Sequence, residues 1–368
     1  MRIKNWDAFL FIAGYHVLLL ALLPFVIGAL SWASFVVFLI TFLIGGISIT
    51  AGYHRLFSHK AYKAHPAYEW VVLILSTLSV QWSALMWSHD HRLHHKHVDT
   101  EQDPYSIKKG FWYAHILWMF RYQRDFDSKV VPDLLKNKRV VFQDRYYLPL
   151  ALAVNGAVFG VACLFMSPFA ALYSGVLLRI CAIHHCTWFI NSLAHTWGSK
   201  TYAKELTAVD NHVLAFLTFG EGYHNYHHAF AGDYRNGIRW YHFDPTKWLV
   251  WVMARVGLVE GLRTVNEIRV RKELVIKDKT LLLSHLSGEL DDLAAELRGK
   301  LEELSTAYET RASALMEKMR ELRKVSDEQR SVLLVEIRQL RRELRAQWKA
   351  WLALTDIAVR QYHVAHQH

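Results

Sequence analysis

The chain has 368 residues, of which 52% are hydrophobic and 14% aromatic, and it contains 14 tryptophans. This composition is typical of an all-α integral membrane protein and argues against an ordinary soluble enzyme. The net charge of +10 does not indicate nucleic-acid binding, because lysines and arginines lie mainly between apolar segments and in the C-terminal region.

The first pair of apolar segments covers residues 8–29 and 30–50, and each segment is long enough to cross a bilayer. Basic residues flank the outer ends of this pair, so the positive-inside rule places both ends in the cytosol. The next apolar segment, residues 70–87, is short. If it crossed the bilayer, the histidines on its two sides would be separated, so we expect a helix at the membrane interface.

A second pair of apolar segments covers residues 147–166 and 169–190. Two transmembrane hairpins, or four spans, therefore leave both termini on the cytosolic side, in a multi-pass protein of the bacterial inner membrane. The second pair also carries His184 and His185, which we interpret as packing residues or neighbours of a site. The spacing of the three cysteines fits neither a disulfide nor a metal site, so we interpret them as small core residues: Cys163, Cys181 and Cys186.

Three histidine clusters follow the apolar segments, at residues 54–59, 91–95 and 224–228. Two of them have the pattern HxxHH. Because positions i, i+3 and i+4 of a helix share a face, each HxxHH cluster directs three imidazoles into one volume. Eight histidines exceed what one first-row metal ion binds, so two metals are implied. Iron is favoured over zinc, since no cysteine lies inside a cluster.

The segments around these clusters are TAGYHRLFSH, DHRLHHK and GEGYHNYHH. In order and spacing they resemble the three histidine boxes of the membrane fatty acyl desaturases, closest to the acyl-CoA (stearoyl-CoA type) delta-9 branch. Residues 191–195, NSLAH, resemble a segment that adds a ninth histidine and a nearby asparagine. The resemblance implies two Fe ions (Fe2+/Fe3+) in a cytosolic helical cap, with Asn191 beside one iron or its bound water. The implied ligands are His54, His59, His91, His94, His95, His195, His224, His227 and His228.

The activity implied by this resemblance is O2-dependent desaturation of a long-chain fatty acyl group, at the delta-9 position, for unsaturated fatty acid synthesis. The resemblance also assigns five residues to the acyl tunnel, the first two at its far end: Phe42, Gly46, Gln81, Trp87 and Trp188. Asp90 matches a head-group residue. His89 and Trp82 stand where acyl-CoA enzymes commonly carry arginine and asparagine, so the acyl carrier stays open between coenzyme A and a phospholipid.

Two other functions remain open at this point. One is a di-iron membrane hydroxylase, and the other is a non-catalytic membrane scaffold with structural metal. The sequence shows neither a dinucleotide fingerprint nor a haem-binding segment, so we expect electrons from a separate donor of the ferredoxin or cytochrome b5 type with its reductase.

The composition changes after about residue 265, so we predict a membrane desaturase domain over 1–265 and a charged amphipathic helical extension over 266–368. Apolar residues recur at threes and fours from Leu286 to Leu322 and again from Leu333 to Trp351. This coiled-coil-like pattern predicts a helical hairpin or a homo-oligomer. A single helix lying on the membrane surface is the alternative.

Overall fold

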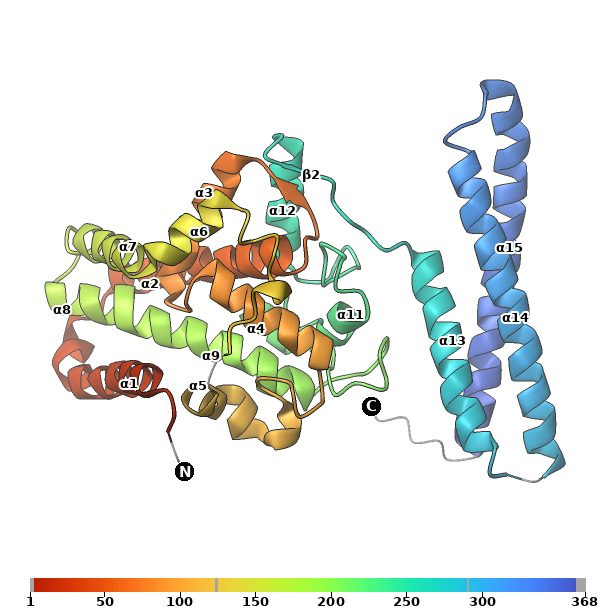
Figure 1. The fold of residues 1–368 in the computed structure, drawn as a ribbon, viewed down its shortest axis with the longest axis horizontal. Helices are drawn as coiled ribbons and strands as arrows, with labels where there is room; N and C mark the ends of the chain where they lie inside the picture. Colours follow the sequence, from red (N-terminus) through yellow and green to blue (C-terminus); the bar gives the residue numbers. More distant parts are fainter. Residues whose placement is uncertain (1–2, 123–124, 290, 362–368) are drawn as a thin grey trace. The chain divides into compact units, whose positions relative to one another are not determined.

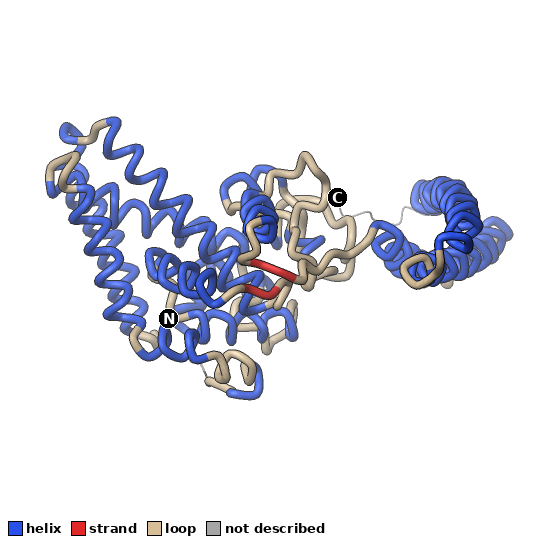
Figure 2. Tube along the Cα trace, turned by 90° about the horizontal axis from the view of Figure 1, so that it is seen from above, coloured by secondary structure: helices blue, strands red, loops and turns tan. Residues whose placement is uncertain are grey.

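The computed structural model describes residues 3–122, 125–289 and 291–361 (Figure 1). The fold is mainly helical, and two short strands, β1 (Lys63–Ala64) and β2 (Val259–Glu260), pair antiparallel and are drawn in red in Figure 2. The chain divides into two compact units, one ending at Thr264 and the other beginning at Val265. Each unit is described by itself below.

Among the described residues, three helical segments are long and apolar enough to cross a membrane: Trp6–Ala29, Trp32–Ser58 and Pro168–His195. They consist of α1 (Trp6–Val26) with η1 (Ile27–Ala29), of α2 (Trp32–Ser48) with η2 (Ile49–Ser58), and of α8 (Pro168–Ala170), η7 (Ala171–Leu178), α9 (Arg179–Ser192) and η8 (Leu193–His195). Large apolar side chains of α1 such as Leu20 and Phe25 are exposed, as expected for a surface that faces lipid. These segments indicate a membrane protein.

The predicted span 147–166 corresponds to α7 (Tyr147–Ala162), a helix of 16 residues. At about 1.5 Å per residue it is roughly 24 Å long, which is less than the bilayer's hydrocarbon core of about 30 Å. The structure therefore supports three of the four predicted spans by length, and α7 is a shorter apolar helix.

The expected single helix over residues 70–87 is instead two helices. α3 (Pro66–Ser76), extended by η3 (Thr77–Ser79), meets α4 (Ala84–His97) at a bend of 81°. Val80 and Trp82, which lie in the break, have φ values of 48° and 69°. This left-handed backbone ends one helix and redirects the chain into the next.

Carbonyl groups freed by this bend are bonded by side chains of α9. The Arg179 guanidinium donates to the Leu78 carbonyl oxygen, and His184 Nε2 lies 2.8 Å from the Ser79 carbonyl oxygen. Irregular backbone in an apolar environment is tolerated only where other groups of the protein supply its hydrogen bonds. His184 therefore has a structural role at the helix break.

The remaining helices of the first unit are short and lie around the long ones. They are η4 (Ile107–Lys109), η5 (Tyr113–Leu117), α5 (Trp118–Arg121), η6 (Ser128–Val130), α6 (Lys138–Arg145), α10 (His212–Leu217), α11 (His224–Ala229) and α12 (Pro245–Arg255).

The second unit consists of α13 (Glu267–Leu286), α14 (Asp292–Glu321) and α15 (Asp327–Gln361), which pack on one another. The predicted stripe from Leu286 to Leu322 is interrupted, because α13 ends at Leu286 and Asp291 caps the next helix by accepting from the Ala294 amide at 2.6 Å. The two apolar stripes cover each other within one chain, as a helical hairpin requires. Their buried core includes Leu282, Leu286, Leu297, Leu301, Tyr308, Leu315, Ile337, Leu344 and Trp351.

Because this core is drawn from α13 to α15 alone, we expect residues 265–368 to fold without the first unit. Leu301 is completely buried, so Leu301→Ala should lower the free energy of unfolding of this fragment by about 2–5 kcal/mol. Leu352 on α15 is 48% exposed. Leu352→Ala should therefore change the free energy of unfolding by at most about 0.5 kcal/mol. Urea denaturation followed by circular dichroism measures both. Equal destabilisation by the two substitutions would contradict this packing.

Candidate metal centre

The predicted histidines reach one region of the first unit from four parts of the chain: η2 with the residue that follows it, α4, η8 and α11. His91, His94 and His95 lie on one face of α4, as the HxxHH spacing predicts. η2 has the wider turns of a π-helix, and the His59 amide donates to the His54 carbonyl oxygen at 3.1 Å. Such an i to i+5 bond brings residues five apart onto one face, and π turns are frequent at functional sites.

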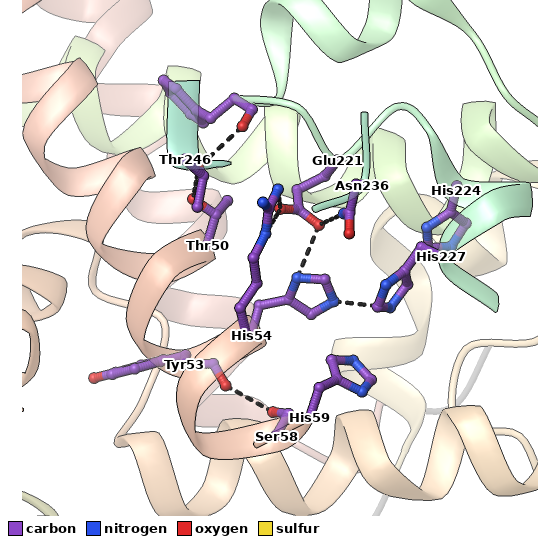
Figure 3. Close-up of polar contacts among 12 residues, drawn as sticks. Thr50, Tyr53, His54, Ser58, His59, Glu221, His224, His227, Asn236 and Thr246 are labelled. Atoms are coloured by element: carbon purple, nitrogen blue, oxygen red, sulfur yellow. Dashed lines mark hydrogen bonds and ion pairs between the residues drawn. The ribbon is translucent and has the colours of Figure 1, made fainter. Parts of the chain in front are cut away.

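The nine imidazoles form two groups, and the ligand atoms within each lie within 4.8 Å of one another. Within the first group, the Nε2 atoms of His59 and His91 lie 2.8 Å apart, and within the second, those of His224 and His195 lie 3.1 Å apart. Figure 3 shows His54 of η2, and His59 directly after η2, beside His227 of α11. The first group is His54, His59, His91, His95 and His227, and the second is His94, His195, His224 and His228.

Several rings of the two groups direct Nδ1 toward an acceptor that belongs to neither group. His54 Nδ1 lies 2.8 Å from a Glu221 carboxylate oxygen, and His94 Nδ1 lies 2.9 Å from Asp103. His195 Nδ1 lies 2.7 Å from the Thr207 hydroxyl, which in turn donates to Asp99. Such acceptors keep the proton on Nδ1 and leave the Nε2 lone pair directed inward.

Inward lone pairs at these distances repel unless a cation lies between them, and an unpaired buried polar nitrogen is costly. Burial, followed by the neighbouring imidazoles, holds the pKa of His227 and His228 well below the usual range. Neutral imidazole is the form that binds a metal. The donor sets therefore fit two metal ions bound by nitrogen.

Glu221 and Arg55 support the first group, and sequence analysis gave neither residue a role. Glu221 lies between His54 and Arg55, whose Nη2 donates to it at 2.8 Å, and Asn236 donates to its other oxygen at 2.6 Å (Figure 3). Although burial opposes ionisation, His54 and Arg55 lower the pKa of Glu221 to about 2. Both residues could have been proposed from the sequence, since each lies inside one of the quoted histidine segments.

A cavity of about 430 Å³ reaches both groups and is lined mainly by apolar side chains. Its wall includes His54, His91, His94 and His224, together with six residues that the resemblance assigned to the tunnel, the head group or the neighbourhood of the iron: Gly46, Gln81, Trp87, Asp90, Trp188 and Asn191. Phe42 is not among the described lining residues. Its ring instead packs on Phe219, at 5.0 Å between ring centroids, and Phe219 lines the cavity.

Phe219 also packs directly on Gly46. A Cβ atom added at Gly46 would overlap the Phe219 ring, so only glycine permits this contact. The pair closes one part of the cavity wall eight residues before His54. Sequence analysis assigned Gly46 to this region but did not identify Phe219.

The family model for fatty acid desaturases matches residues 30–259. A probable acyl-CoA desaturase of Schizosaccharomyces pombe is 40% identical over 66% of this chain and 52% of its own length. Acyl-CoA desaturase 1 of Saccharomyces cerevisiae is 37% identical over 65% of this chain and 48% of its own length.

An sn-1 stearoyl-lipid 9-desaturase of Anabaena variabilis is 32% identical over 72% of this chain and 95% of its own length. The chain thus spans about half the length of the two yeast proteins and nearly all of the Anabaena protein. With the family model matching most of its first unit, the chain belongs to the fatty acid desaturase family.

Proposed function

We propose that this protein is a membrane desaturase that introduces a double bond at position 9 of a long-chain fatty acyl group. The observation that carries the proposal is the convergence of two groups of imidazole lone pairs on an apolar cavity. The names of the similar proteins support the reaction and its position. The reaction removes two hydrogens from adjacent methylenes and reduces O2 to two waters, with two electrons and two protons supplied from outside.

The nine histidines of the two groups would hold two Fe ions, with Asn191 beside them in the cavity wall. When bound, iron with O2 supplies the oxidising power that removes hydrogen from an unactivated methylene, which no acid or base side chain can do. Glu221 orients the His54 ring through Nδ1, and Arg55 holds the Glu221 carboxylate. These outer contacts set the direction of the ligand nitrogens.

The cavity contributes by positioning the acyl chain, because adjacent methylenes of that chain are chemically alike. Trp87 stacks on His91, with ring centroids 4.8 Å apart, and also forms part of the cavity wall. An acyl chain held against this wall would present a given methylene pair to the metal groups. The apolar lining also keeps water away from the reacting carbons.

For the acyl carrier we propose coenzyme A, as the names of the yeast proteins suggest, with a phospholipid as the alternative that the Anabaena protein suggests. Asp90 lines the cavity, and its Oδ1 lies 3.0 Å from His89 Nδ1. His89 Nε2 accepts from the Asp127 amide at 3.1 Å. This chain thus holds Asp90 with histidine at a position that commonly carries arginine in the acyl-CoA enzymes.

The proposal includes a cytosolic site with both termini in the cytosol, and electrons from a separate ferredoxin or cytochrome b5 with its reductase. The bacterial inner membrane and a homo-oligomer also remain predictions. Of the competing functions, a hydroxylase would yield an alcohol in place of an alkene. Mass spectrometry of lipids from expressing cells, with the double bond located chemically, tests the reaction and its position.

Replacing one ligand in each group should abolish the reaction. His95→Ala and His228→Ala should each lower bound iron and reduce desaturation at least about 100-fold, since even outer contacts of ligands are worth 10- to 100-fold. His97 lies on the same helix as His95 but outside both groups, so His97→Ala should retain iron and activity. Iron analysis and product analysis measure both. Near-normal turnover in the two ligand variants would refute the di-iron proposal.

Changing the contact between Gly46 and Phe219 should change the preferred acyl length. In Gly46→Ala the new methyl group displaces the Phe219 ring into the cavity, so the longest accepted acyl chain should shorten. Phe219→Ala should have the opposite effect. Gly156 on α7 has open space around it, and Gly156→Ala should leave the length profile unchanged. Competition among saturated substrates of different lengths gives the profile, and an unaltered profile in both cavity variants would place the length-determining wall elsewhere.

A further inference from the structure

A third cluster of metal-binding side chains lies apart from the two histidine groups. It joins α1 to α9 through His16, Cys181 and His185, whose ligand atoms lie within 4.8 Å of one another. Cys181 and His185 are four residues apart, so they share a face of α9. Polar side chains in apolar helices are costly and mark functional sites by default.

The proton of the His16 ring is placed by α1 itself. His16 Nδ1 lies 2.7 Å from the Ile12 carbonyl oxygen, which can only accept a hydrogen bond. The proton is therefore on Nδ1, and His16 Nε2 carries a lone pair. That nitrogen lies 3.1 Å from Nε2 of His185.

The proton of the His185 ring is placed by a chain of three hydrogen bonds. The Ser192 hydroxyl donates to the Trp188 carbonyl oxygen at 3.0 Å, so its oxygen accepts from Nδ1 of His115, also at 3.0 Å. His115 Nε2 then carries a lone pair and accepts from His185 Nδ1 at 3.1 Å. His185 Nε2 is consequently unprotonated as well.

Two lone pairs thus face each other at 3.1 Å, with Cys181 Sγ 3.9 Å from His16 Nε2. Zinc bonds of about 2.0–2.1 Å to nitrogen and about 2.3 Å to sulfur predict tetrahedral edges of about 3.4 Å and about 3.6 Å. The observed distances are close to these values. The hydrogen bond from His185 to His115 is also the outer contact that ligating histidines usually make.

We propose that His16, Cys181 and His185 bind one Zn2+ ion, which cross-links α1 to α9. The Cys181 thiol loses its proton to solvent as the zinc–sulfur bond forms, and the fourth position is left for a water molecule. Trp188 lies one turn beyond His185, stacks on the His16 ring at 6.5 Å and lines the cavity. The ion would therefore help to position Trp188, which forms part of the cavity wall. This assignment replaces the interpretation of Cys181 as a core residue.

The test uses the full chain, loaded with iron, purified in detergent and then titrated with Co2+ as a probe for Zn2+. The wild type should bind one equivalent of Co2+ with the absorption of a cobalt–thiolate bond, and Zn2+ should displace it. Cys181→Ser should lose that absorption while keeping its iron, and Cys163→Ser, at the end of α7, should retain it. His115→Leu should weaken Co2+ binding by about 10- to 100-fold.

A second measurement needs no variant. In the iron-loaded wild type, Zn2+ should slow alkylation of Cys181 by a membrane-permeable thiol reagent at least tenfold, and should leave Cys163 unprotected. Peptide mass spectrometry distinguishes the two cysteines. Unchanged alkylation of Cys181, or no cobalt–thiolate absorption in the wild type, would overturn the proposal and leave a proton shared between His16 and His185.

Discussion

Packing nine imidazoles into one buried region is the constraint on which the first unit depends. Their inward nitrogens can bind a cation when their outward nitrogens carry the proton, and acceptors placed around the site favour this state for several of the rings. Glu221 and Asp103 serve two of the rings directly, and Thr207 serves His195 with support from Asp99. The arrangement of the site thus depends on these hydrogen bonds as well as on the histidines themselves.

The break between α3 and α4 is what brings the second histidine segment to the first. A straight continuation of α3 would carry His91 away from His54, whereas the 81° bend brings α4 against η2. Arg179 and His184 supply hydrogen bonds to the carbonyls at this bend. Two polar residues of an apolar helix therefore stabilise the arrangement of the histidines without belonging to either histidine group.

The cavity shows how one small residue controls shape in an apolar wall. Phe219 occupies the space that any side chain at Gly46 would need, and Phe42 packs behind it. The size of these three residues sets the space available along α2, while Trp87 and Trp188 limit the cavity elsewhere. Selectivity for an alkyl chain depends on such packing, because a methylene chain offers no polar group to recognise.

Local periodicity and chemistry determined much of this protein from the sequence alone: the apolar segments, the eight histidines of the three clusters and the two apolar stripes of the C-terminal region follow from spacing and residue type. Tertiary structure alone decided how the histidines are divided, since the first group joins His91 and His95 to His54, His59 and His227 from distant segments, while His94 joins the second group. It also decided the roles of Glu221, Phe219 and the bend before α4. These depend on contacts between residues far apart in the chain, which packing establishes and local spacing does not encode.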